Sequence, residues 1–390
     1  MRDRVPAAAN LTRLRELNSL SIVHALRGSA PATASELATR TGLSRHSADV
    51  IVRSLVEDGW VEVIEPTGSV VGRPARRYRF HATVGHVMGV DVGGHKILAL
   101  ITDLDGNVIA SARRLVQPED LPKSRLAAMD ATIAECLQAA AMTPADLWAL
   151  TIGVTGPVDS SGRTSLFSPM PGWSDVDPIG HLSDRFSCPI QVENDCKLAA
   201  MAERWRGVAQ DADDIVYVLA GMRTGAALII DGKVRRGFGG AAGEIGWLAP
   251  VRWERSVTHL ENCGSLPSDV EPNEVLGWVL TACRDGDPEA QLAVKRYVKD
   301  LAVGAAALTL ALDPQVVVLG GGVSRSADVI LDQFRVELEK LTLRLPEVRV
   351  SVFGDESVAL GAVRLGIDEV DAHSFGEQLL RPVAPRRAAS

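Results

Sequence analysis

The chain of 390 residues is long enough for two or three domains with buried cores. No apolar run approaches the about 18–20 residues of a membrane helix, and the first residues lack the apolar segment of a signal peptide, so we expect a cytoplasmic protein with no membrane partner. The net charge of −8 is uneven, because residues 1–81 hold 12 basic and only 8 acidic residues. A basic segment ahead of an acidic remainder indicates contact with a polyanion.

Three helices are predicted in the basic segment. Apolar residues at helical spacing give a first helix that ends at Gly28. Thr33 and Glu36 have the spacing of a capping box, which predicts a short second helix that ends near Gly42. Ser44 is the expected N-cap of a third helix. Two helices, a glycine turn and another helix follow the order of a helix-turn-helix.

Two strands around a loop are predicted after the third helix, which makes a wing. The third helix begins with hydroxyl, guanidinium and imidazole groups that suit base edges and phosphates in a major groove, and Arg73 lies in an extended Gly-Arg-Pro strip suited to a minor groove. The candidate DNA-binding residues are Ser44, Arg45, His46, Ser47, Arg53, Arg73, Arg76 and Arg77. The alternative is a helical protein-interaction module with solvated arginines.

From residue 86 onward the pattern changes to apolar strands, tight glycine turns and helices. A strand hairpin followed by a helix and further strands occurs twice, which predicts an α/β body of two related lobes with a cleft between them. The stretches that carry this pattern are HVMGVDVGG, KILALITDL, NVIASARRL and LWALTIGVTGPVD in the first half, and DIVYVLAGM, GAALIIDGKV and PQVVVLGGGVS in the second.

The order and spacing of six motifs resemble the ROK family of repressors, open reading frames and sugar kinases. The motifs are GVDVGGHKI, GVTGPVD, MPGW, VENDCKLAAMAE, GAAGEIGWL and VVVLGGGVS. The resemblance covers nearly the whole chain and implies a two-lobed actin/hexokinase-like body, which in the family's regulators follows a winged helix-turn-helix. It implies a DNA-binding domain at 1–81, an N-terminal lobe at 86–196 completed by a helix near 358–369, and a C-terminal lobe with effector cleft and dimer contacts at 197–357. Residues 371–390 are rich in Pro, Arg and Ala without lasting periodicity, which predicts a disordered tail.

The phosphate loops of this chain depart from those of the family's kinases. The first loop keeps Asp91, Gly93 and Gly94, but His95 stands where the kinases have threonine. The second loop reads GMRTGAAL, with Arg223 and alanines in place of a run of glycines. Side chains at these positions hinder the approach of backbone N–H groups to phosphate. We therefore expect no kinase activity and no cofactor, and an active ATP-dependent sugar kinase with an appended DNA-binding segment is the alternative.

The residues that bind sugar in the family are only partly retained in this chain. It implies that Asn194, Asp195 and Glu244 bind a sugar, with Asp195 as the vestige of a general base. Polar family ligands are replaced elsewhere, at Pro169, Trp247 and Val270. We expect Asn194, Asp195, Glu244 and Trp247 to bind an effector and expect no catalytic residue. Trp247 either stacks on that effector or fills the space of a lost metal site.

The zinc site of the family is altered in this chain. The resemblance aligns Glu261, Cys263 and Ser268 with three cysteines, and this donor set suits tetrahedral zinc poorly. We therefore expect no metal. The five cysteines lack CxxC spacing, which favours free thiols.

Together these features predict a sequence-specific DNA-binding transcriptional regulator, a repressor of carbohydrate-related genes. We expect a homodimer or homotetramer that is associated with the nucleoid and binds an inverted-repeat operator in double-stranded DNA. Its small-molecule effector would be a sugar or sugar phosphate. The alternatives are the sugar kinase and an architectural protein without a ligand.

Overall fold

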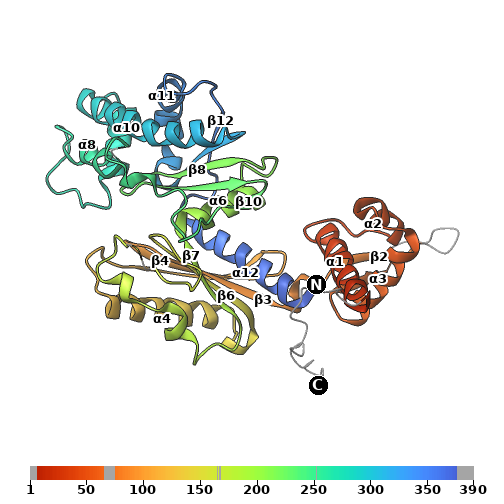
Figure 1. The fold of residues 1–390 in the computed structure, drawn as a ribbon. Helices are drawn as coiled ribbons and strands as arrows, with labels where there is room; N and C mark the ends of the chain where they lie inside the picture. The colour runs from red at the N-terminus through yellow and green to blue at the C-terminus, as the bar shows by residue number, and fades with distance from the viewer. Residues whose placement is uncertain (1–6, 66–74, 165, 167, 252, 376–390) are drawn as a thin grey trace, which may run out of the picture.

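The computed structural model describes residues 7–65, 75–164, 166, 168–251 and 253–375. Figure 1 shows a small N-terminal head beside a body of two lobes. We use "head" for the described residues up to 81 and "body" for those from 86 onward. No helix in these ranges is long and apolar enough to cross a membrane.

The head contains three helices followed by a two-stranded wing. Thr33 accepts a hydrogen bond from the N–H of Glu36 and the Glu36 carboxylate accepts one from the N–H of Thr33, so the predicted capping box is confirmed. Gly42 ends the second helix with φ of 70°, and Ser44 caps the third. The elements are α1 (Ala7–Leu26), α2 (Ala34–Thr41), α3 (Arg45–Glu57), β1 (Val61–Ile64) and the antiparallel β2 (Arg77–Phe80).

The N-terminal lobe is built on a five-stranded sheet in the order β5-β4-β3-β6-β7. The first three strands form antiparallel hairpins, whereas β6 and β7 run parallel to β3. Buried apolar residues on both faces of β3 and β4 explain why helices cover the sheet. The elements are β3 (His86–Val92), β4 (Lys96–Asp103), β5 (Val108–Leu115), α4 (Pro122–Ala139), β6 (Leu147–Val154), α5 (Pro178–Leu182) and β7 (Ile190–Asn194).

The C-terminal lobe repeats this arrangement. Its sheet has the order β10-β9-β8-β11-β12, again with an antiparallel hairpin side and two parallel strands. Helices α9 and α10 pack on this sheet through a large apolar core. The elements are β8 (Ile215–Leu219), β9 (Gly225–Ile230), β10 (Lys233–Val234), α7 (Trp253–Ser256), α8 (Thr258–Glu261), α9 (Val275–Arg284), α10 (Pro288–Leu312), β11 (Val316–Gly320), α11 (Ala327–Glu339) and β12 (Glu347–Val350).

Two helices lie between the sheets, α6 (Asp195–Arg206) and α12 (Ser357–Phe375), and they pack against each other (Figure 1). Helix α12 returns to the N-terminal lobe and covers β3 and β6, where the sequence predicted a completing helix. It continues past Asp371, where we expected the tail to begin, so that expectation was wrong for residues 371–375. The reason is that Asp371 and Phe375 are buried against the head. Residues 376–390 lie outside the described part of the chain.

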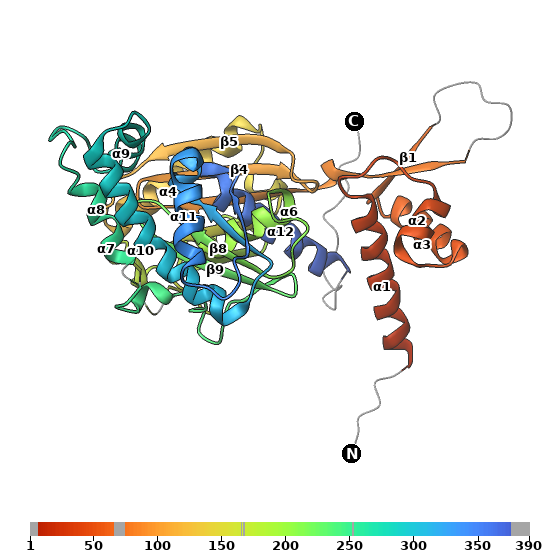
Figure 2. The ribbon, with the colours of Figure 1, turned by 90° about the horizontal axis from the view of Figure 1, so that it is seen from above.

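The head packs directly on the body. Apolar residues of α1, α3 and the wing share one core with β3, β4 and α12. Trp60 of the head packs edge-on against Trp148 and lies 4.9 Å from the ring of Phe375, measured between centroids. Figure 2 shows the head attached at the end of the body where α12 ends, with α1 beside that end.

Candidate DNA-binding surface and ligand site

The start of α3 presents the predicted recognition residues to solvent. Ser44 accepts a hydrogen bond of 3.0 Å from the N–H of Ser47, and their hydroxyls lie 2.9 Å apart. Arg45 and His46 follow the cap and are exposed, and their side chains form no hydrogen bond or ion pair with another described residue. The opposite face of the helix, which includes Ala48, is buried in the head. The helix is therefore anchored on one side and open on the side that begins with these residues.

The arginines of the head differ in their partners. Arg53 pairs with Asp49 one turn earlier on α3. Arg77 of β2 lies 3.2 Å from Glu36 and donates to a backbone carbonyl of the α1–α2 connection. Arg76 is exposed and has no such pair within the described residues. The prediction for Arg73 concerns a residue outside the described part of the chain.

The first loop of the body is held by two basic side chains. The turn between β3 and β4 closes through a hydrogen bond of 2.9 Å from the N–H of Gly93 to the Lys96 carbonyl. The fully buried Arg125 donates to the carbonyl of Gly93 at 2.6 Å and contacts that of Gly94. Lys96 lies 3.3 Å from the buried carboxylate of Asp91, the residue that opens the loop. The buried guanidinium of Arg125 thus holds the carbonyl groups of the loop in place.

Charge at this loop is set by burial. Burial raises the pKa of Asp91 to about 6, and neighbouring Asp195 adds to the rise while Lys96 opposes it. Burial lowers the pKa of His95, and the positive charges of Arg223 and Arg125 lower it further. A neutral His95 therefore stands beside Arg223, which belongs to the second loop, between β8 and β9. The two replaced loop positions thus face the same region between the lobes.

Asn194 and Asp195 lie at the junction of β7 and α6. The side-chain oxygen of Asn194 caps α6 by accepting a hydrogen bond from the N–H of Lys197. The side-chain NH₂ group donates to the carbonyl of Gly156 and to the Asp195 carboxylate, each at 3.0 Å. Burial raises the pKa of Asp195, whereas the N–H of Cys196 and the charge of Arg223 work against the rise. The partly exposed Asp195 carboxylate can accept hydrogen bonds from the hydroxyl groups of a ligand, while the Asn194 amide holds that carboxylate in place.

The segment that carries Glu244 is tied to the same junction. The Lys197 side chain is fully buried and donates to the carbonyl of Gly240. Arg236 pairs with the buried carboxylate of Glu193, the residue before Asn194. Burial raises the pKa of Glu244, the charge of Asp195 raises it further, and Lys197 opposes the rise. Three of the predicted ligand residues, Asn194, Asp195 and Glu244, therefore lie close together.

Of the two alternatives for Trp247, the filling of the lost metal site does not agree with its position. Its side chain is 61% exposed, whereas Trp253 is 3% exposed. The ring of Trp253 lies against Gly304, where a Cβ would overlap it, and donates a hydrogen bond to the Leu301 carbonyl at 3.3 Å. Trp253 fills the interior because it begins α7 and faces α10, whereas Trp247 precedes that helix in a short surface turn.

The altered metal motif forms no metal cluster in the residues that the structure describes. Cys263 is buried, and its Sγ lies 3.3 Å from the hydroxyl of Ser265. Glu261 and Ser268 are exposed. No group of three or more His, Cys, Asp and Glu side chains within the described ranges could hold a metal ion. The absence of zinc stays a prediction.

Sequence reasoning missed four charged residues at the ligand site: Lys96, Arg125, Lys197 and Arg236. Lys96 and Lys197 stand next to quoted motif residues, and a lysine next to a buried strand end was the available signal. Arg125 acts on a loop about 30 positions earlier, and nothing in its local sequence indicates that contact.

Comparisons with known proteins cover nearly all of the chain. The sequence matches the model of the ROK family over residues 87–266 and 267–369, and a MarR family model over residues 11–69. It is 21% identical to the xylose repressor of Caldicellulosiruptor bescii over 93% of this chain and 98% of that protein. It is 27% identical to a glucokinase of Streptomyces coelicolor over 65% of this chain and 86% of that one.

The fold has solved counterparts. A ROK family transcriptional regulator, a homologue of the Mlc protein of E. coli, superposes with a TM-score of 0.73 and 18% identity over 93% of this chain and 99% of that one. Relatives of this chain thus include regulators and kinases. The family match spans both lobes, and the regulator shares the fold of head and body. The chain belongs to the ROK family and carries a winged helix-turn-helix of the MarR type ahead of its body.

Proposed function

We propose that this chain is a sequence-specific DNA-binding regulator, a repressor of carbohydrate-related genes. The observation that carries the proposal is the start of α3, where Arg45 and His46 are exposed beside a capped N-terminus. A helix presented in this way can enter a major groove, with its backbone N–H groups toward phosphate. The likeness to the xylose repressor and the MarR family match support the same role.

The ion pairs of the head are compatible with phosphate binding. Arg53 with Asp49 and Arg77 with Glu36 are exposed pairs. Such pairs contribute only about 0–1 kcal/mol, so a DNA phosphate can displace the carboxylate at small cost. Arg76 has no pair to give up among the described residues. We therefore assign phosphate contacts to Arg53, Arg76 and Arg77 and base contacts to Arg45 and its neighbours.

Substitution of Arg45 tests the assigned surface. Arg45→Ala is expected to weaken binding to a duplex selected by the wild-type protein by about 1–3 kcal/mol, because a bidentate base contact is lost. Binding to an unrelated duplex should change little. Fluorescence anisotropy at fixed salt measures both. Arg284→Ala, which removes an exposed arginine of the body, is the matched control. Equal affinity of Arg45→Ala and wild type for the selected duplex would contradict the assignment.

We further propose that the body senses a sugar or sugar phosphate without phosphorylating it. Asp195 and Glu244 are partly exposed acceptors for ring hydroxyls, Asn194 orients the Asp195 carboxylate, and exposed Trp247 would stack on an apolar sugar face. Two observations speak against ATP turnover. His95 occupies the first loop, and Arg223 in the second loop puts a bulky side chain where phosphate would approach. The likeness to glucokinases keeps the kinase as the alternative.

One experiment separates the sensor from the kinase. The purified protein is mixed with a panel of hexoses, pentoses and their phosphates, with and without ATP, while thermal stability and ADP release are followed. We expect at least one compound to stabilise the protein, by about 2.7 kcal/mol at 100 times its Kd, with no ADP above background. The stabilisation should disappear in Asp195→Ala. ADP release by wild type that Asp195→Asn abolishes would establish the kinase instead.

The assembly that we propose is a homodimer or homotetramer on an inverted repeat in the cytoplasm, associated with the nucleoid. Two heads related by a twofold axis would meet half-sites about one helical turn, or a multiple of it, apart. A ligand between the lobes would change operator affinity only if it binds one arrangement of lobes and heads more tightly than another.

A further inference from the structure

Helix α12 connects the region between the lobes with the head. It begins at Ser357, directly after the connection from β12, and ends at Phe375 inside the core that head and body share (Figures 1 and 2). Along its length it packs closely on both neighbours. A Cβ at Gly361 would overlap the Leu198 carbonyl of α6, and a Cβ at Gly89 of β3 would overlap the Ala359 carbonyl of α12. The helix is therefore held as a rigid body.

The end of α12 at the head is fixed by a buried ionic contact. Arg27, which directly follows α1, donates two hydrogen bonds to the Asp371 carboxylate, at 2.6 and 2.8 Å, and His24 Nε2 lies 3.1 Å from the same group. The side chains of Arg27 and Asp371 are only 7% and 6% exposed. The Arg27 guanidinium also lies 4.8 Å from the ring centroid of Phe80. We call His24, Arg27 and Asp371 the latch.

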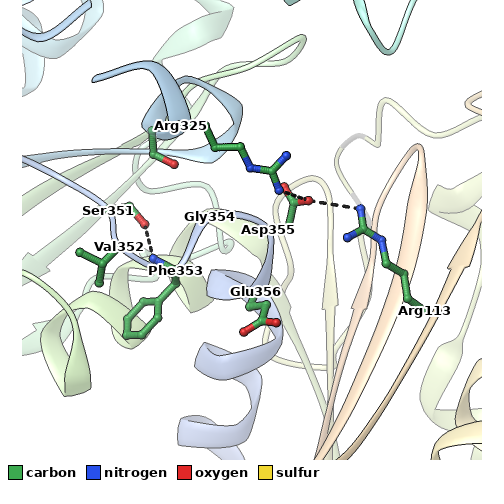
Figure 3. Close-up of a pocket in the computed structure, with 9 residues that line it drawn as sticks. Arg113, Arg325, Ser351, Val352, Phe353, Gly354, Asp355 and Glu356 are labelled. Atoms are coloured by element: carbon green, nitrogen blue, oxygen red, sulfur yellow. Dashed lines mark hydrogen bonds and ion pairs between the residues drawn. The ribbon is translucent and has the colours of Figure 1, made fainter. Parts of the chain in front are cut away.

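The other end of α12 is fixed by an exposed ionic contact. Asp355, two residues before the helix, lies 3.2 Å from Arg113 of β5 and 2.5 Å from Arg325, which follows β11 (Figure 3). Arg113 belongs to the N-terminal lobe and Arg325 to the C-terminal lobe. The three residues line a pocket of about 440 Å³ that is open to solvent, and Arg325 is 65% exposed. We call Arg113, Asp355 and Arg325 the clamp.

The two contacts differ in strength. An exposed ion pair contributes about 0–1 kcal/mol, whereas breaking a buried pair leaves an uncompensated charge and is strongly unfavourable. A rotation that moves β5 away from the start of the β11–α11 connection would separate Asp355 from Arg113 or from Arg325, because these arginines belong to different lobes. When the lobes move, the clamp should therefore open first, while the latch keeps the head attached to α12.

We propose that α12 transmits the lobe arrangement to the head: the clamp holds α12 in one position relative to both lobes, and the latch makes the head follow α12. The proposal rests on the proposed function in that the head it moves is a DNA reader. The clamp also meets the first loop of the body, because Lys96 donates a hydrogen bond to the backbone carbonyl of Asp355. A ligand that favours a different lobe arrangement would act through the clamp.

Distances between spin labels on the full chain test the proposal without DNA. One label replaces Val50 on α3 and the other replaces Leu343, which precedes β12, and both positions are exposed. Pulsed electron paramagnetic resonance gives the distance distribution between head and C-terminal lobe. Asp355→Ala and Arg325→Ala are each expected to shift or broaden it. Arg284→Ala breaks an exposed pair with Asp328 away from α12 and should leave it unchanged.

The latch is tested in combination with the clamp. Arg27→Lys keeps the charge but loses the pair of hydrogen bonds from the guanidinium to Asp371. In the Arg27→Lys background, Asp355→Ala should have a smaller effect on the distribution of distances between the labels. In DNA binding, Asp355→Ala should change operator affinity by about fivefold or more, and Arg27→Lys should reduce that change. Clamp variants whose distributions match wild type overturn the proposal, as does a clamp effect that the latch variant leaves undiminished.

The outcome is distinguishable from a failure of the proposed function. If wild-type protein binds no duplex while the clamp variants still shift the distance distribution, the DNA-binding function fails and the transmission by α12 stands. If wild type binds DNA and the distributions do not respond to the clamp, the transmission fails and the DNA-binding function stands.

Discussion

Asp91 carries a charge that the fold disfavours. Its side chain is buried at the end of β3, and Lys96 at 3.3 Å compensates only part of the desolvation. The pKa of Asp91 accordingly rises from 3.8 to about 6. In the family's kinases the loop that opens with this residue approaches phosphate. Here Arg125 holds the carbonyls of the loop and Lys96 pairs with the Asp91 carboxylate, so Asp91 has a structural role in this chain.

The raised pKa of Asp91 makes the free energy of unfolding depend on pH in a defined direction. Because the folded state binds this proton more tightly than the unfolded chain, the contribution of Asp91 to stability falls as pH rises from about 4 to about 6. Chemical unfolding of wild type and Asp91→Asn between pH 4 and 7 measures it. The stability of wild type relative to the variant should increase on acidification by about 1–3 kcal/mol. A pH-independent difference would contradict the assignment.

At the scale of elements, α6 and α12 determine how the lobes meet. Their backbones approach so closely that Gly361 has no room for a side chain beside the Leu198 carbonyl. Residues of both helices join the core beneath the C-terminal sheet. The crossing of α6 and α12 is thus the packing contact between the lobes, and we expect it to act as the hinge of any lobe movement.

Adding one methyl group at this crossing should be costly. Gly361→Ala is expected to lower the free energy of unfolding by about 1–3 kcal/mol or more, because the overlap is with backbone that cannot move aside. Gly277→Ala is the matched control, since Gly277 lies in α9 with no neighbouring atom within 4 Å. It should be neutral or stabilising by up to about 1 kcal/mol. Urea unfolding of both variants measures the difference, and equal effects would show that the crossing tolerates a side chain.

Local signals predicted the elements well, and contacts distant in sequence escaped prediction. The capping box at Thr33 and Glu36 and the cap at Ser44 involve neighbouring residues, so the sequence alone located these helix starts. The end of α12 was missed because its last turn is held by Arg27, 344 positions away. The size of Trp247 left open whether it lies inside or on the surface, and a surface turn places it outside.

At the scale of the molecule, one sheet design occurs twice and a head is fixed to one end. Both sheets have the same order of hairpin and parallel strands, which the repeated sequence pattern predicted. The proposed ligand residues Asn194, Asp195 and Glu244 came from the family resemblance, and the structure links their segments through Lys197 and the charge of Asp195. Neither pattern nor resemblance indicated that the head would share a core with the body, because that contact joins residues from both ends of the chain.

The most direct test of the DNA-binding function is selection of duplexes from a random pool by the purified full chain at low ionic strength. We predict enrichment of an inverted repeat whose half-sites lie about one helical turn, or a multiple of it, apart. Affinity for the enriched duplex should exceed affinity for a scrambled one by at least about 10³-fold, and Arg45→Ala should lose most of that preference. A pool that stays random, with equal binding of every duplex or of none, would contradict the function proposed for this protein.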